Sequence, residues 1–204
     1  MAKTILVPSS NGYHQYLSSD LLTLERTVSL KGEVNSESIF EIIEQLLYLD
    51  HQSDRPITLL ICSPGGQVES GLALIDVMKT LRSPINTVAV GMAASMAGVI
   101  FACGSESRRY ILPSSTVMIH DPLVPSLGRT NLSQMISTSK DMEKTRNIIN
   151  EILAERCHKN IREINKATKA ETYLKGQEAV KFGIADQLLD SELTKGQDLL
   201  TAIH

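Results

Sequence analysis

The sequence predicts an α/β protein in which a mainly parallel sheet carries helices on its faces. Strand-like apolar runs alternate with helical patterns from residue 27 to about residue 103, in the order β-α-β-α-β-α. The connections between these runs are short, which implies parallel strands joined by right-handed crossovers. The run ITLLI at 57–61 is apolar throughout, as expected for a strand that is covered on both faces.

Composition limits the classes of function that fit the chain. The 204 residues, of which 42% are hydrophobic, suit one medium-sized domain, and the net charge of −3 favours neither nucleic acid nor an anionic membrane as the main partner. No apolar run reaches the roughly 18 residues of a membrane span, and the first residues lack the pattern of a signal peptide. Three scattered cysteines argue against a zinc site or a disulfide framework. We therefore expect a cytoplasmic protein with no metal and no cofactor.

Individual elements are predicted from hydrophobic periodicity and from turn residues. Strands are expected at 27–30, 57–61, 86–90, 109–112, 116–120 and 184–189. Helices are expected at 36–49, 68–81, 93–103, 131–156, 160–168 and 177–182, the first capped by Ser36 and the long one by Asn131 or Thr130. The turn-rich segment 1–19 is expected to be loosely held, with Ile5–Val7 docking or forming a hairpin arm, and 191–204 is expected to be a polar tail.

The long helix predicted at 131–156 is polar on most sides. Its apolar row is too narrow to anchor the whole helix inside a core. Such a helix projects from the domain or packs against another subunit. An amphipathic helix on the surface of the same domain is the alternative.

Ser95 lies at the junction between the strand predicted at 86–90 and the buried helix that follows, within the small-residue run GMAASMAGVI. A serine in this position can present its hydroxyl beside the unpaired N–H groups of a helix start. Similar strand-to-helix turns carry the nucleophile of other hydrolases. Taken alone, a serine in a turn of small residues is more often a helix cap than a nucleophile.

Two further strand ends carry residues that suit the same chemistry. His120 ends an apolar strand and precedes Asp121-Pro122, whereas the other four histidines fall in polar loops or near the chain ends. A histidine at the carboxyl end of a strand can serve as a general base, or simply hydrogen-bond locally. In Ser63-Pro64-Gly65-Gly66, the glycines allow close approach of a ligand. The N–H groups of Gly66 and Met96 would then form a two-donor oxyanion hole, although the motif also fits a tight turn.

The motifs SPGG, GMAASM and VMIHDP follow one another in this order, and LLTLERTVSLKGEV, INEILAE and YLKGQEAVKFGIADQLL add to the pattern. In these motifs and their spacing the chain resembles the family of ClpP, the proteolytic subunit of caseinolytic (Clp) proteases. The resemblance extends from about Gly12 to Leu189. It implies a serine peptidase with a crotonase-like, or ClpP-like, α/β fold of repeated β-α-β units and a long projecting handle helix.

The resemblance also implies an assembly and partners. Subunits of this family stack as two rings of seven around a closed chamber, with identical or mixed subunits. An AAA+ unfoldase of the ClpX, ClpA or ClpC kind would feed unfolded proteins through an axial pore lined by residues 1–19. The head would comprise 20–130 and 157–190, the handle 131–156 and the tail 191–204.

By the same resemblance, Ser95 would be the nucleophile, His120 the general base, and Gly66 and Met96 the oxyanion donors. The third member of the family's triad is an aspartate shortly before an aromatic residue, and Glu171 takes its place here. Glutamate has the same charge on a longer side chain, and Ser-His-Glu triads exist on other folds. A role for Glu171 in orienting His120 therefore stands beside the alternative of an ordinary surface residue.

With the other departures from the family pattern, more than one class of function remains open. Asp121 is a poor substitute for Glu171, because the next residue along a strand points to the opposite face from His120. The loop 121–130 is longer than usual in the family and contains Pro125.

The first hypothesis is a processive, ATPase-dependent serine protease. The second is a catalytically attenuated structural or regulatory ring subunit that works with an active paralogue. The third is a crotonase-type acyl-CoA enzyme, although no adenine-binding signature is present.

Overall fold

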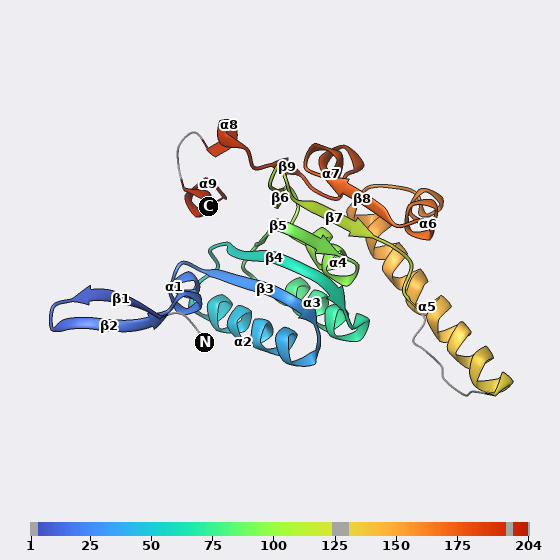
Figure 1. Ribbon diagram of the computed structural model, residues 1–204, viewed down its shortest axis with the longest axis horizontal. Coiled ribbons are helices and arrows are strands. Elements are labelled where there is room, and N and C mark those ends of the chain that lie inside the picture. The colour runs from blue at the N-terminus through green and yellow to red at the C-terminus, as the bar shows by residue number, and fades with distance from the viewer. Residues whose placement is uncertain (1–3, 124–130, 195–197, 204) are drawn as a thin grey trace.

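A parallel sheet forms the centre of the structure. In the computed structural model, which describes residues 4–123, 131–194 and 198–203, five strands lie side by side and parallel (Figure 1). They are, in spatial order, β3 (Thr27–Val34), β4 (Ile57–Gly66), β5 (Ile85–Ala94), β6 (Arg109–Ile111) and β9 (Gln187–Leu188). The predicted α/β class and the parallel connections are therefore confirmed.

The free edge of β5 is shared by two strands, and this arrangement brings distant residues together. β6 pairs with the first half of β5, whereas β7 (Thr116–Ile119) pairs with its last residues, Met92 to Ala94. β8 (Thr172–Lys175), which the sequence pattern did not predict, then pairs antiparallel to β7. The segments that follow β5 and β7 and the one that precedes β8 consequently lie at neighbouring positions.

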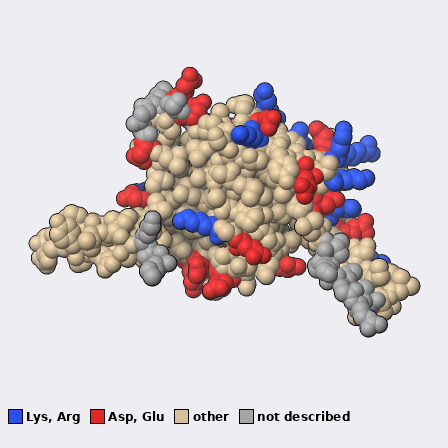
Figure 2. Space-filling view, viewed as in Figure 1, with Lys and Arg blue, Asp and Glu red and all other residues tan. Residues whose placement is uncertain are grey.

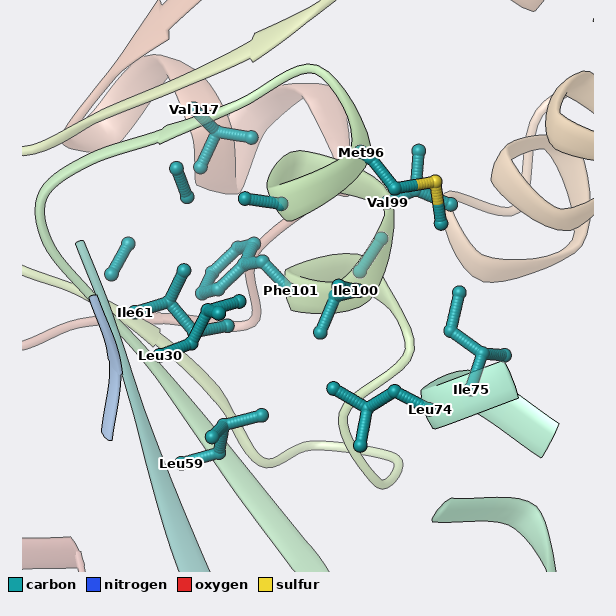
Figure 3. Packing of buried hydrophobic residues seen from close by; sticks show 14 of the residues in the cluster. Leu30, Leu59, Ile61, Leu74, Ile75, Met96, Val99, Ile100, Phe101 and Val117 are labelled. Atoms are coloured by element: carbon teal, nitrogen blue, oxygen red, sulfur yellow. The ribbon is translucent and has the colours of Figure 1, made fainter. Parts of the chain in front are cut away.

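Helices from the first half of the chain pack on one face of the sheet. α2 (Ser36–Gln52), α3 (Val68–Thr80) and α4 (Met96–Ala102) contribute to one buried apolar cluster with β3, β4 and β5. All seven residues of α4 are buried, as predicted from its Ala- and Met-rich sequence. Figure 3 shows Phe101 beside Leu30 and Ile61, with Ile100 of α4 facing Leu74 of α3.

Several predicted boundaries were wrong, because pairing between strands continues beyond the apolar runs. β4 and β5 extend to Gly66 and Ala94, so SPGG belongs to a strand, and α4 begins only at Met96. The cap of α2 is Asn35 rather than Ser36: its side chain accepts a hydrogen bond from the N–H of Ser38 at 2.9 Å.

Two elements extend away from the head (Figure 1). At one end, β1 (Thr4–Ser9) and β2 (Gly12–Leu17) form an exposed antiparallel hairpin, followed by α1 (Ser18–Leu24), which was not predicted. At the other end, α5 (Leu132–Arg156) projects outward and is capped by Asn131. The prediction of a hairpin arm and that of a projecting helix are confirmed. None of the described helices is both long and apolar enough to cross a membrane.

The last residues fold back onto the sheet, which the polar composition of 191–204 did not predict. After α6 (Ile161–Lys169), α7 (Gln177–Phe182) and α8 (Ser191–Thr194), the short helix α9 (Leu199–Ile203) brings Ile203 against a second apolar cluster with Val88, Tyr110 and Leu189. Asn86 Nδ2 donates to the Ile203 carbonyl at 3.0 Å. The apolar residues of this segment therefore cover part of the second face of the sheet.

A buried ion pair connects α5 to the sheet. Arg109, which is 4% exposed, donates through Nε to Asp186 at 2.9 Å and through Nη1 to the Arg156 carbonyl at 2.7 Å. Burial alone would raise the pKa of the Asp186 carboxyl, but hydrogen bonds and the positive charge of Arg109 outweigh it and lower that pKa below its ordinary value. The base of the projecting helix is thus held by a charge-assisted network.

We expect the substitution Asp186→Asn to reduce the free energy of unfolding by about 3 kcal/mol at neutral pH, because it leaves the buried Arg109 charge unpaired. A carboxyl with a lowered pKa stabilises the fold above its unfolded-state pKa, and the effect is lost as pH falls through its folded-state pKa. Urea unfolding measures the free energy of unfolding of the parent protein and of Asp186→Asn. The difference between the two proteins should be smaller at acidic pH than at neutral pH. Asp141→Asn, in the exposed pair with Lys144, is the control and should cost less than about 1 kcal/mol.

Candidate active site

Ser95 occupies a strained turn between β5 and α4. Its backbone has φ 55° and ψ −126°, in a region that non-glycine residues rarely adopt. The N–H of Ser95 donates to the Met118 carbonyl at 2.8 Å, and its carbonyl accepts from the N–H of Gly98 at 2.9 Å. The hydroxyl makes no capping hydrogen bond to α4. Ser95 therefore occupies the N-cap position of α4, but the alternative that its side chain serves as a simple helix cap is wrong, and the hydroxyl is available for other contacts.

His120 is the partner of this hydroxyl: its Nε2 lies 2.8 Å from Ser95 Oγ. The contact follows from the pairing of β5 with β7, in which Ala94 lies opposite Met118. Two residues further along an extended chain, the side chain of His120 points to the same face as that of Met118. When Ser95 Oγ donates to Nε2, the proton of the neutral imidazole resides on Nδ1.

Glycines allow the SPGG segment to lie directly against the serine turn. A Cβ atom on Gly65, where φ is +92°, would lie 2.7 Å from Ser95 Cβ and 2.9 Å from Met96 N. A Cβ on Gly66 would collide with the Val34 carbonyl of the neighbouring strand. Both positions therefore require glycine, and Gly65, Gly66 and Ser95 line the same groove.

The backbone nitrogen of Met96 lies next to Gly65, whereas its side chain is part of the core. The side chain is 2% exposed and lies over Gly71 of α3, where a Cβ atom would come within 2.6 Å of Met96 Cε. Figure 3 shows its sulfur pointing away from Val117. As the first residue of α4, Met96 has an N–H without an intrahelical acceptor. Gly66 and Met96 thus supply two candidate backbone donors.

Glu171 lies next to His120 but is not bonded to it. Ile119 pairs with Thr172, so His120 and Glu171 lie opposite each other, one residue beyond the paired ends of β7 and β8. The Glu171 carboxylate is exposed and accepts a hydrogen bond from the Tyr173 hydroxyl at 3.0 Å. Among the described residues, no hydrogen bond joins Glu171 to His120.

These residues line one groove of about 720 Å³. Residues of the SPGG and VMIHDP motifs line it. α5 contributes Met142 and Thr145 to the lining, which the sequence analysis missed. Its described lining contains three carboxylates and no lysine or arginine: Glu33, Glu69 and Glu171. Basic side chains gather elsewhere, at the end of the molecule where α6 lies (Figure 2). The described lining of the groove is therefore acidic, and it also contains six apolar residues: Pro64, Val68, Met118, Pro122, Leu123 and Met142.

Asp121, Cys103 and Cys157 do not compete for these roles in the described structure. The N–H of Asp121 donates to the Thr168 carbonyl at 2.8 Å, and its side chain lines two separate hollows with Arg146. Burial raises the pKa of both the Cys103 and Cys157 thiols to about 11, so neither is a thiolate at neutral pH. Pro125 and the expected long loop lie largely outside the described residues.

A serine and a histidine in hydrogen-bond contact at adjacent strand ends define a serine-hydrolase type of site on an α/β fold. The sequence model of the Clp protease family matches residues 10–192 of this chain. The chain is also 37% identical over 193 residues to the ATP-dependent Clp protease proteolytic subunit of Ligilactobacillus salivarius (strain UCC118), covering 94% of this chain and 97% of that protein. The chain belongs to the Clp protease family and is a serine peptidase.

We expect Gly65→Ala to lower peptide hydrolysis about 100-fold, since an error of 1 Å in the position of a catalytic group has an effect of that size. The added Cβ atom would force the turn away from Ser95 and Met96. Peptide cleavage and thermal unfolding, measured on the same preparation, would separate this effect from general instability. Gly32→Ala is the matched control, because Gly32 also has a positive φ, +73°, but has open space around it. Equal losses of activity in both variants would contradict the explanation.

Proposed function

We propose that this chain is the proteolytic subunit of an ATP-dependent Clp protease, in which Ser95, His120 and Glu171 hydrolyse peptide bonds of unfolded proteins. The observation that carries the proposal is the 2.8 Å contact between Ser95 Oγ and His120 Nε2, in a groove large enough for an extended peptide. The name of the Ligilactobacillus salivarius relative supports ATP dependence.

In the first chemical step, Ser95 Oγ attacks the carbonyl carbon of the peptide while His120 Nε2 accepts the hydroxyl proton. The carbonyl oxygen becomes an oxyanion, which the N–H groups of Gly66 and Met96 stabilise. Removing one donor of this kind typically lowers a rate by about 100- to 1000-fold. Imidazolium then gives its proton to the leaving amine, and water hydrolyses the ester by the same route.

Glu171 completes the triad by accepting the Nδ1 proton of His120 as a hydrogen bond. It would keep the imidazole in the correct tautomer and stabilise the imidazolium that forms. Its position opposite His120 supports this role. The absence of a bond between them in this structure favours one alternative, an attenuated structural or regulatory ring subunit that depends on an active paralogue. The acyl-CoA enzyme has no such support, because acyl-CoA chemistry does not need the serine–histidine pair.

The two extensions suit an assembly of two stacked rings of seven subunits. The exposed apolar residues of α5 would be covered if the helix interleaved with the opposite ring; they are Leu132, Met135, Ile136 and Ile148. The uncharged hairpin at residues 4–17 would line the axial pore, where a cytoplasmic AAA+ unfoldase delivers its substrates. Mixed rings with a paralogue are compatible with the same surfaces.

We expect Ser95→Ala to abolish peptide hydrolysis and covalent labelling by a fluorophosphonate, with a loss of at least about 1000-fold in kcat and an unchanged particle size. Ser114→Ala, at an exposed turn position, is the control and should be labelled like the parent protein. If the assembled parent protein, alone or with its paralogue, is not labelled at Ser95, the structural alternative replaces the protease.

Hydrolysis should decrease on acidification, because a general base must be neutral to accept the serine proton. The profile of kcat/KM against pH measures this effect in the free enzyme. Thermal unfolding at each pH is the control, since protonation of Asp186 also weakens the fold in acid. A profile that remains flat while the fold is intact would exclude His120 as the base.

A further inference from the structure

Tyr173 contacts the acidic residue of the site although it is not part of the core. Its hydroxyl donates to Glu171 Oε2 at 3.0 Å, and the residue is 57% exposed. No other hydrogen bond to this carboxylate is found in the described part of the chain. We propose that Tyr173 is a positioning residue, which holds the carboxylate of Glu171 where it can accept the Nδ1 proton of His120. The inference rests on the proposed role of Glu171.

The pairing of β7 with β8 places the side chains of His120, Glu171 and Tyr173 on one face of the sheet. Met118 lies opposite Tyr173, and Ile119 lies opposite Thr172. Residues two apart on an extended chain point to the same side, so Glu171 and Tyr173 share the face of Met118 and His120. Since Glu171, Met118 and His120 all line the groove, the phenol acts beside the reacting groups without being one of them.

A glutamate in this position needs support that a shorter acid would not. Its side chain has one more rotatable bond than that of aspartate, and immobilising a long side chain has an entropic cost. The backbone is already fixed on both sides, because the N–H of Asp121 donates to the Thr168 carbonyl and Thr172 Oγ1 donates to the Ala167 carbonyl at 2.7 Å. The remaining freedom lies in the side chain of Glu171, and the phenol restricts it.

The hydrogen bond leaves the carboxylate able to serve His120. An ionised carboxylate has two oxygens and can accept about four hydrogen bonds, and the phenol occupies only one site on Oε2. Oε1 is free of described partners and suits the Nδ1–H of His120. The hydrogen bond to Glu171 and the negative charge of that residue raise the pKa of Tyr173 above its ordinary value, so the phenol remains a donor at neutral pH.

The test is the substitution Tyr173→Phe, which removes one oxygen from an exposed ring. We expect kcat for a short peptide to fall roughly three- to tenfold with KM nearly unchanged, the size of a lost hydrogen bond to a charged group at a partly exposed site. In a Glu171→Ala background, the same substitution should change nothing further. Tyr48→Phe is the matched control, since Tyr48 lies on α2 outside the groove and is similarly exposed, at 59%.

Three outcomes would overturn the inference. An unchanged kcat would show that the contact is incidental. An equal loss in the Glu171→Ala background would show that the ring acts through packing rather than through the carboxylate. A gain in kcat would show that the phenol withholds the carboxylate from His120.

Failure of the proposed function would be visible separately, because the parent protein would then neither cleave peptide nor react with the fluorophosphonate. In that case an NMR titration of the Tyr173 ring still tests the contact with Glu171 on which the inference depends. The pKa of the phenol should fall toward its ordinary value in Glu171→Ala if the contact exists. An identical titration in both proteins would overturn it.

Discussion

The site depends on how the single free edge of β5 is divided between two strands. β6 uses the first half of that edge and β7 the second half, so the end of β7 lies beside the serine turn. The hydrogen bond from Ser95 N to the Met118 carbonyl continues this pairing. It sets the distance between the two catalytic elements, because His120 is only two residues further along. The antiparallel strand β8 then uses the outer edge of β7 and delivers Glu171.

The strained backbone conformation of Ser95 is maintained by the residues packed around it. Main-chain hydrogen bonds hold the residue on both sides, Gly65 fills the space next to its Cβ atom, and the buried helix α4 follows directly. Strain of this kind persists only where the rest of the structure determines the backbone. The result is a hydroxyl that does not cap its own helix and remains directed at His120.

Replacing aspartate by glutamate at position 171 has different consequences in different surroundings. On a bare surface, a longer acid would sample many positions and contribute little to orienting the imidazole of His120. Here the chain places an aromatic hydroxyl two residues away, at hydrogen-bond distance.

The sequence by itself determined the α/β class, the order of the main elements, the projecting helix and the family, because these depend on local periodicity and on linked motifs. It also identified Ser95, His120 and Glu171 as candidates, through their places at the predicted ends of strands and in the family pattern. Only the tertiary structure decided that the Ser95 side chain makes no capping hydrogen bond, that β8 exists, that α5 lines the groove and that Tyr173 contacts Glu171. These features depend on contacts between segments far apart in the chain. A local sequence pattern does not specify which segment pairs with which edge of β5 or β7.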